Sequence, residues 1–168
     1  MESAIKIINE IQKTGLVKAY AIGGGIALSY YVEPILTFDL DIFFIPPKER
    51  LDSLSPIYEY LKKKGYKHQK EMIIIEGIPV QFIPAYNELV KEAVEKASQS
   101  KYRRVKTRIL KVEHLLAIAL QTDRSKDRER VIKILDEARI DKSYLEKILK
   151  RFDLYDKFLN FKSRYYER

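Results

Sequence analysis

Two aspartates, Asp39 and Asp41, lie in an otherwise apolar stretch at residues 38–45 that is typical of a strand. Because side chains alternate between the two faces of a strand, both carboxylates are expected on one face, with Cα atoms roughly 6–7 Å apart. A carboxylate pair at this spacing can share a divalent cation such as Mg²⁺. The alternative is neutralisation by basic side chains alone, because a buried pair of like charges is costly.

Three of the six glycines of the chain are consecutive, Gly23, Gly24 and Gly25. A predicted strand at residues 17–22 enters this run, and a predicted helix at residues 26–32 leaves it. Backbone N–H groups at the start of a helix favour phosphate, and glycine lets the backbone come close to a ligand. The other interpretation is a tight turn with close packing. The run is no P-loop, because no Gly-Lys-Ser/Thr follows it.

A third candidate feature is basic. If residues 102–110 form one strand, Arg104, Lys106 and Arg108 share a face, with Tyr102 in line. A row of cations beside an aromatic ring can hold a nucleic-acid backbone. A half-buried strand with a solvated outer face would have the same pattern.

The elements that must position these residues follow from periodicity and from the Gly and Pro positions. Predicted helices cover residues 2–14, 26–32, 48–64, 88–97, 112–120, 128–138, 144–151 and 154–164. Predicted strands cover residues 17–22, 38–45, 72–75, 78–83 and 102–110. This order predicts an α/β (α+β) core at residues 1–110 and a C-terminal helical part at residues 111–168, within one compact unit.

Composition limits the function classes. The 168 residues carry a formal net charge of +8, which divides into −1 over residues 1–100 and +9 over residues 101–168. Such asymmetry favours an anionic partner for the C-terminal part, although a solvated lysine-rich surface would look the same. No apolar run is long enough to cross a membrane, and cysteine is absent. We therefore expect a cytoplasmic protein without membrane association.

In combination, the glycine turn and the aspartate pair resemble the nucleotidyltransferase superfamily that shares the DNA polymerase β palm. More closely, they resemble the AbiE-type toxin nucleotidyltransferases. The matching residues are Gly23, Gly24, Ala27, Thr37, Asp39 and Asp41. A second stretch, residues 114–131, also matches, with a leucine-rich helix followed by Arg124, Lys126 and Asp127.

This resemblance implies a mixed sheet flanked by helices, and a transfer of NMP from an NTP to an RNA or protein acceptor. It implies nucleotide binding by Gly23–Gly25 and Thr37, and Mg²⁺ binding by Asp39 and Asp41. Lys126 would pair with a phosphate, and Asp127 would orient it or contact the acceptor. The implied partners are an NTP, RNA (with tRNA as the natural candidate) and a cognate toxin or antitoxin protein.

The sequence departs from the active pattern in two places. Gln81 stands where active relatives carry a third carboxylate and the general base, and Ala119 stands where they often carry a lysine. Glu71 or Glu76 could substitute for Gln81; the other interpretation is that each is an ordinary charge of the predicted hairpin. Two alternatives therefore stay open: a non-catalytic relative that binds nucleotide or RNA, and an interaction module of a toxin–antitoxin pair.

Overall fold

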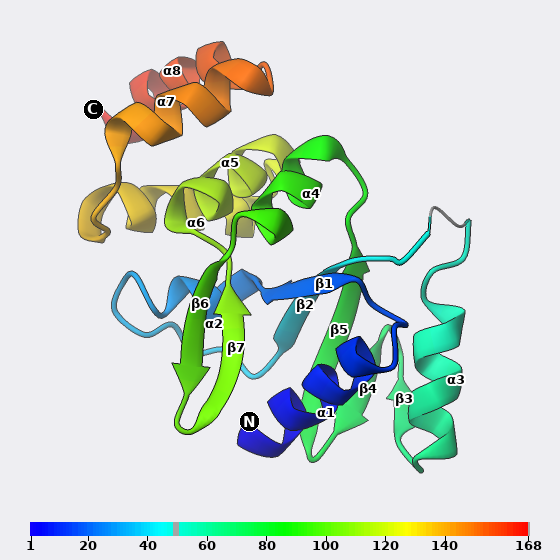
Figure 1. Cartoon of the computed structure of the whole chain (residues 1–168). Helices are drawn as coiled ribbons and strands as arrows, with labels where there is room; N and C mark the ends of the chain where they lie inside the picture. Colours follow the sequence, from blue (N-terminus) through cyan, green and yellow to red (C-terminus); the bar gives the residue numbers. More distant parts are fainter. Residues whose placement is uncertain (49–50, 168) are drawn as a thin grey trace.

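The computed structural model describes residues 1–48 and 51–167. Its strands are β1 (Ala19–Ile22), β2 (Leu40–Ile45), β3 (Lys67–Gln69), β4 (Met72–Ile75), β5 (Ile78–Pro84), β6 (Ser98–Tyr102) and β7 (Val105–Ile109). Its α-helices are α1 (Glu2–Lys13), α2 (Gly24–Leu28), α3 (Ser55–Lys63), α4 (Glu88–Glu95), α5 (Val112–Thr122), α6 (Ser125–Glu137), α7 (Lys142–Arg151) and α8 (Tyr155–Phe161), followed by a π-helical turn, Lys162–Tyr166. Figure 1 shows their arrangement.

The strands form a single mixed sheet in the order β3-β4-β5-β2-β1-β7-β6. Three strand pairs carry the site. Strands β1 and β2 run antiparallel, whereas β2 and β5 run parallel, as do β1 and β7. The mixed sheet flanked by helices, with a helical C-terminal part, agrees with the predicted fold class.

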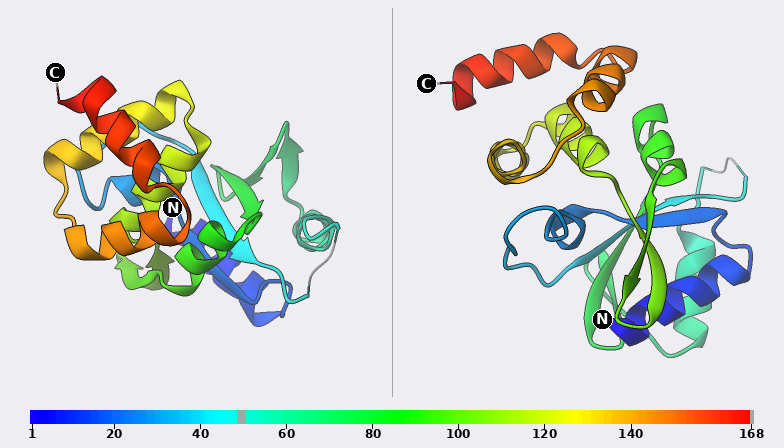
Figure 2. Two further views of the ribbon diagram at one scale, coloured as in Figure 1. Left: turned by 90° about the horizontal axis from the view of Figure 1, so that it is seen from above. Right: turned by 60° about the vertical axis from the view of Figure 1, so that its left-hand side comes forward.

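The two faces of the sheet are covered by different helices (Figures 1 and 2). Leu40, Ile42 and Phe44 of β2 are buried, and the Phe44 ring meets Phe82 edge to face. Tyr58 of α3 also contacts Phe82, so this face of β2 and β5 lies under α3. Asp41 therefore points to the opposite face, beneath α5 and α6.

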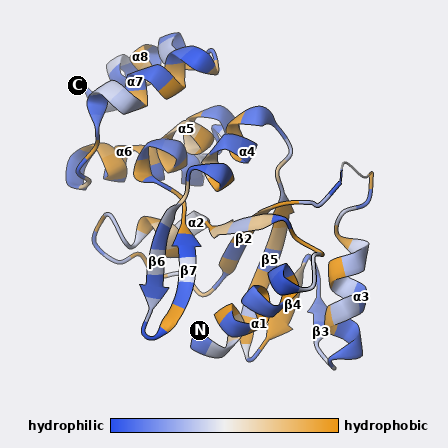
Figure 3. Ribbon diagram, viewed as in Figure 1, coloured by the Kyte–Doolittle hydropathy of each residue, from blue (hydrophilic) through white to orange (hydrophobic). Residues whose placement is uncertain are grey.

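The C-terminal helices form two layers above that face (Figure 2). Helix α5 is apolar on nearly all sides, and its residues 112–120 are all buried. Such a helix must be covered all round, and it contacts α2, α4, α6 and α7. Figure 3 shows that α7 and α8, in the outer layer, have mixed apolar and polar positions, as expected for helices with one face in water.

Several predicted elements differ from the observed ones. Residues 102–110 are not one strand, because β6 and β7 form a hairpin that turns at residues 103–104. The helix predicted at residues 48–64 begins only at Ser55; part of the predicted first turn, residues 49–50, lies outside the described residues. Helix α2 includes Gly24 and Gly25 and ends at Leu28, and β3 was not predicted.

None of the helices in the described part of the chain is long and apolar enough to cross a membrane.

Candidate functional site

A cavity of about 570 Å³ lies between the sheet and helices α5 and α6. It contains all five residues predicted to be catalytic: Asp39, Asp41, Gln81, Lys126 and Asp127. Gly24, Thr122, Arg124 and Arg130 also line it. The cavity thus joins residues from both predicted parts of the chain, and its size is typical of small-molecule sites.

The centre of the site is the contact between β2 and β5. These strands run parallel, and their register pairs Asp41 directly with Gln81. Burial raises the pKa of Asp41, and the Arg130 guanidinium opposes that rise more strongly than the Asp39 carboxylate adds to it. The residue beside Asp41 on the next strand thus carries a neutral amide, and the cation with the largest effect on the pKa of Asp41 is Arg130 of α6.

The glycine run is shaped by what lies against it. Gly24 has a left-handed backbone with φ +59°, and a Cβ there would lie 1.9 Å from Oδ2 of Asp41. A Cβ on Gly23 would lie 2.3 Å from the Phe43 ring. Real Cβ contacts are never this short, so Gly24 is required for the Asp41 carboxylate to reach its position.

Three of the predicted nucleotide-binding residues, Gly23, Gly25 and Thr37, have other contacts. The N–H of Gly23 donates to the carbonyl of Asp41 at 2.9 Å, which extends the β1–β2 ladder, so this group is not available to a phosphate. Gly25 packs against Thr37, and both line a second cavity on the outer side of Lys126 and Arg130. Only Gly24 of the glycine run lines the main cavity.

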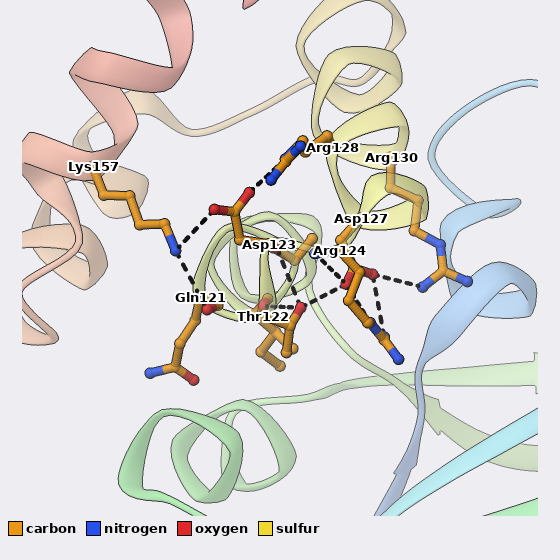
Figure 4. Close-up of polar contacts among 10 residues, drawn as sticks. Gln121, Thr122, Asp123, Arg124, Asp127, Arg128, Arg130 and Lys157 are labelled. Carbon is orange, nitrogen blue, oxygen red and sulfur yellow. Dashed lines mark hydrogen bonds and ion pairs between the residues drawn. The ribbon is translucent and has the colours of Figure 1, made fainter.

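Asp127 is the hub of a polar cluster at the start of α6 (Figure 4). Its Oδ2 accepts hydrogen bonds from the Thr122 hydroxyl at 2.8 Å and from Nε of Arg124 at 2.7 Å. Its Oδ1 lies 3.3 Å from Nη2 of Arg124 and 3.5 Å from Nη1 of Arg130. Burial favours the neutral acid, but the bonds from Arg124 and Thr122 outweigh it and lower the pKa of Asp127. Asp127 thus orients Arg124 and Arg130. Within the described residues, none of its hydrogen bonds involves Lys126.

A second set of contacts in Figure 4 fixes the end of α5. Asp123 caps this helix in a left-handed conformation, with φ +53°. Its carboxylate pairs with Nε of Arg128 at 2.8 Å and with Nζ of Lys157 at 3.6 Å. Lys157 lies on α8, so these contacts tie the outer helical layer to the turn that carries Arg124.

We expect Asp127→Asn to destabilise the protein by about 1.5–3 kcal/mol at pH 7, because a buried, charge-assisted acceptor is lost. A lowered pKa in the folded state means that the carboxylate contributes stability above its unfolded pKa, and that this contribution disappears as the pH falls through the folded value. The difference between wild type and variant should therefore shrink below about pH 4. Urea unfolding at several pH values measures it.

The exposed carboxylate of Asp153 offers a matched control. It has a left-handed backbone, which asparagine tolerates, so Asp153→Asn should change stability by less than about 0.5 kcal/mol. Equal effects of the two substitutions, or an Asp127→Asn effect that does not depend on pH, would contradict the assigned role.

The structure separates the predicted nucleic-acid-binding residues from the cavity. Arg104 lies in the hairpin turn, and Lys106 and Arg108 lie on β7. The Arg108 guanidinium donates to the backbone carbonyls of Glu95 at 3.0 Å and Ala97 at 3.3 Å, which stabilises the entry to β6. Arg108 is therefore a structural residue, and the predicted basic row is shorter than the sequence indicated.

Several polar or aromatic cavity residues were not assigned a role from the sequence. Arg124 was only a match to relatives, and Thr122, Arg130 and Tyr86 were missed. A helical signal existed for Arg130, because residues 126, 127, 130 and 134 follow an i, i+1, i+4, i+8 pattern. No local signal marks Tyr86, which follows β5 and keeps 52% of its surface exposed at the cavity.

The oxygen ligands at the cavity suit one Mg²⁺ that also binds a substrate better than an ion held by protein side chains alone. Within residues 1–48 and 51–167 there is no cluster of three or more His, Cys, Asp or Glu side chains placed to hold an ion. Asp39, Asp41 and the Gln81 amide nevertheless offer oxygen ligands around one cavity. Mg²⁺ is commonly held by one or two carboxylates together with phosphate oxygens of a substrate, and this set matches that case.

Comparison with protein families and with curated proteins gives no match to this sequence. Among solved structures, an antigenic nucleotidyltransferase-like protein from Paracoccidioides brasiliensis superposes with a TM-score of 0.53 at 13% identity, over 94% of this chain and 91% of that chain. ANT(2″)-Ia in complex with adenylyl-2″-tobramycin gives a TM-score of 0.46 at 18% identity, over 96% and 98% of the two chains. At such identities the likeness concerns the backbone alone, and it shows that the chain has a nucleotidyltransferase-like fold.

Proposed function

We propose that this protein binds a nucleoside triphosphate with Mg²⁺ in the cavity and transfers the NMP group to an acceptor. The observation that carries the proposal is the convergence of Asp39, Asp41 and Lys126 from separate elements on one cavity beside the glycine turn. Carboxylates suit a divalent ion, and lysine suits a phosphate, so the combination fits a metal-bound polyphosphate.

The mixed lining of the cavity supports a nucleotide rather than a bare polyphosphate. It includes three cationic side chains, Arg124, Lys126 and Arg130. It also includes apolar and aromatic side chains, among them Phe43, Ile83, Tyr86, Ile118 and Ala119. A ligand with a charged tail and a planar, weakly polar head satisfies both kinds of side chain. Ala119, where relatives often carry a lysine, adds no charge to this lining.

In the proposed reaction, an acceptor oxygen attacks the α-phosphorus, and the bond from that phosphorus to the oxygen of pyrophosphate breaks. Bound Mg²⁺ would supply neutralisation of charge on the phosphate oxygens. Asp39 and Asp41 would hold the ion, and Lys126 with Arg124 would orient the triphosphate. Gln81 can accept a hydrogen bond from the acceptor or from water, but it cannot take the acceptor proton, which must leave to solvent.

The motif resemblance supports a finer form of the same proposal. On that basis the protein is an AbiE-type relative that modifies an RNA, such as tRNA, or a protein, and works beside a cognate toxin or antitoxin. The absence of cysteine is consistent with a cytoplasmic site of action.

A second candidate function is nucleotide binding without transfer. The specific observation in its favour is the pairing of Asp41 with Gln81, which provides an amide where a third carboxylate would complete the metal site. In this case the protein would recognise Mg²⁺–nucleotide and pass the signal to a partner.

Calorimetric titration of wild type with ATP, GTP, CTP or UTP and Mg²⁺ tests the shared part of both functions. We expect saturable binding that requires Mg²⁺ and falls at least about tenfold in Asp39→Asn/Asp41→Asn, because both carboxylate ligands are lost. Sodium tripolyphosphate with Mg²⁺ should bind more weakly than the best nucleotide. A wild type that binds no NTP would overturn both functions. If the wild type does bind an NTP, labelled-NTP transfer assays distinguish nucleotidyl transfer from nucleotide binding without transfer.

A further inference from the structure

The β6–β7 hairpin is a strongly cationic projection of the sheet. Residues 96–112 contain seven basic residues and no Asp or Glu. The four basic side chains nearest the tip of the hairpin are exposed: Lys101, Arg103, Arg104 and Lys106. None of these four takes part in an ion pair among those found in residues 1–48 and 51–167. In Figure 3 most of both strands has the hydrophilic colour.

The pairing within the hairpin sets like charges against each other. The antiparallel register places Lys101 directly opposite Lys106, on the same face. Like charges in such cross-strand positions destabilise a hairpin. A nearby acid would relieve the repulsion, but the sequence offers none over these residues, so an external anion is the natural source of compensation.

The turn of the hairpin adds two guanidinium groups at its tip. Arg103 has a left-handed backbone, with φ +53°, in a two-residue turn between Tyr102 and Val105. Turns of this kind favour Asn or Gly. Of the other two-residue turns in the sheet, Glu76–Gly77 follows that rule with a glycine at φ +77°, whereas Lys70–Glu71 places a lysine at φ +59°. Arginine at the tip therefore costs stability that a glycine would not.

A shallow depression of about 420 Å³ adjoins the hairpin. Lys101 and Lys106 line it together with the polar side chains of Asn9, Gln12 and Ser100. Amide and hydroxyl groups beside cations can hydrogen-bond to phosphate and sugar oxygens. The Arg103 guanidinium lies over the Tyr102 ring at 6.0 Å, so an aromatic surface is also present at the tip.

From these features we propose that the β6–β7 hairpin binds the sugar–phosphate backbone of a nucleic-acid strand. Lys101 and Lys106 form a cross-strand pair, and Arg103 and Arg104 occupy the turn beyond them. Four cations gathered at one end of the hairpin can contact neighbouring phosphates of a strand, and Tyr102 offers a ring for a base. Arg108 is excluded, because its guanidinium is bonded to backbone carbonyls.

This surface goes beyond the nucleotide cavity and does not rest on it. None of the four exposed basic residues lines that cavity. Residue 104 lies five positions before Ile109, which pairs with Ile22 next to the glycine turn, so the tip is about 17 Å from the cavity end of β7.

The test measures binding of a short single-stranded RNA, and of DNA of the same sequence, by fluorescence anisotropy over a range of salt concentrations. The hairpin variant replaces Lys101, Arg104 and Lys106 with glutamine. We expect it to weaken binding roughly tenfold or more near physiological salt, and to reduce the slope of log K against log salt by about 2. Because it removes the repulsion between Lys101 and Lys106, this variant is not expected to unfold.

The matched control changes the net charge of the protein by the same amount on another surface. It replaces three exposed lysines at the other end of the sheet with glutamine: Lys62, Lys63 and Lys67. Less than about a twofold loss is expected from this control. Equal losses in both variants, no binding by wild type, or equally tight binding of poly-glutamate would overturn the proposal. Tighter binding of RNA than DNA, or the reverse, would identify which nucleic acid the hairpin uses.

Discussion

Replacing Gln81 with aspartate should raise the rate of nucleotidyl transfer by roughly 100-fold or more, the usual contribution of a positioned general base. The reason is the strand register. Gln81 is the partner of Asp41 across β2 and β5, so a carboxylate there would stand beside the proposed metal ligands and could accept the acceptor proton. Labelled-NTP transfer onto RNA, compared between wild type and variant, measures the effect.

The same variant should change the response of stability to Mg²⁺. Without the ion, a third carboxylate near Asp39 and Asp41 adds repulsion, so the variant should melt below wild type at pH 7. With millimolar Mg²⁺ the order should reverse, because an ion that binds only the folded state stabilises it. Thermal melts with and without Mg²⁺ test this independently of any acceptor.

Gln81→Asn is the control, because it shortens the side chain as aspartate does but adds no charge. An aspartate variant that behaves like the asparagine variant in both assays would mean that position 81 does not complete the site. A wild type that already transfers NMP at a high rate would mean that another group takes the proton.

The parts of the site that could be predicted are those encoded over short distances in sequence. Asp39 and Asp41 both line the cavity, as the alternation of a strand predicted, although β2 begins only at Leu40 and Asp39 lies just before it. The glycine run was predicted to be a turn before a helix, and α2 begins there. Close packing against Asp41 and Phe43 explains why residues 23 and 24 are glycines. Such packing was one of the two interpretations of the glycine run, and phosphate binding was the other.

The secondary-structure predictions failed where the local sequence signal was weak, and contacts were missed where they join elements that are distant in sequence. The β6–β7 turn contains Tyr-Arg-Arg-Val rather than Gly, Asn or Pro, so the hairpin was read as one strand. The hydrogen bond from Thr122 to Asp127 was not anticipated either, because the two residues lie on different helices, α5 and α6. Strand order is likewise non-local, and only the structure brings Gln81 beside Asp41.

Gly24→Ala should destabilise the protein by about 2–6 kcal/mol. Left-handed backbone strain for a non-glycine residue contributes about 1–3 kcal/mol, and overpacking contributes about 1–3 kcal/mol more. The new Cβ would lie 1.9 Å from Oδ2 of Asp41, so either the turn or the carboxylate must move. Urea unfolding measures the loss, and displacement of Asp41 should also reduce Mg²⁺-dependent nucleotide binding.

Gly77 separates the two contributions. It too has a positive φ, +77°, but nothing lies within 4 Å of the position that its Cβ would take, so Gly77→Ala should show backbone strain alone. A double-mutant cycle with Asp41→Ala should recover the steric part of the Gly24→Ala cost, about 1–3 kcal/mol, and leave the strain. If Gly24→Ala costs no more than Gly77→Ala, the carboxylate moves aside freely. The glycine is then not what holds Asp41 at the cavity, and the turn must be explained by a ligand that approaches its backbone.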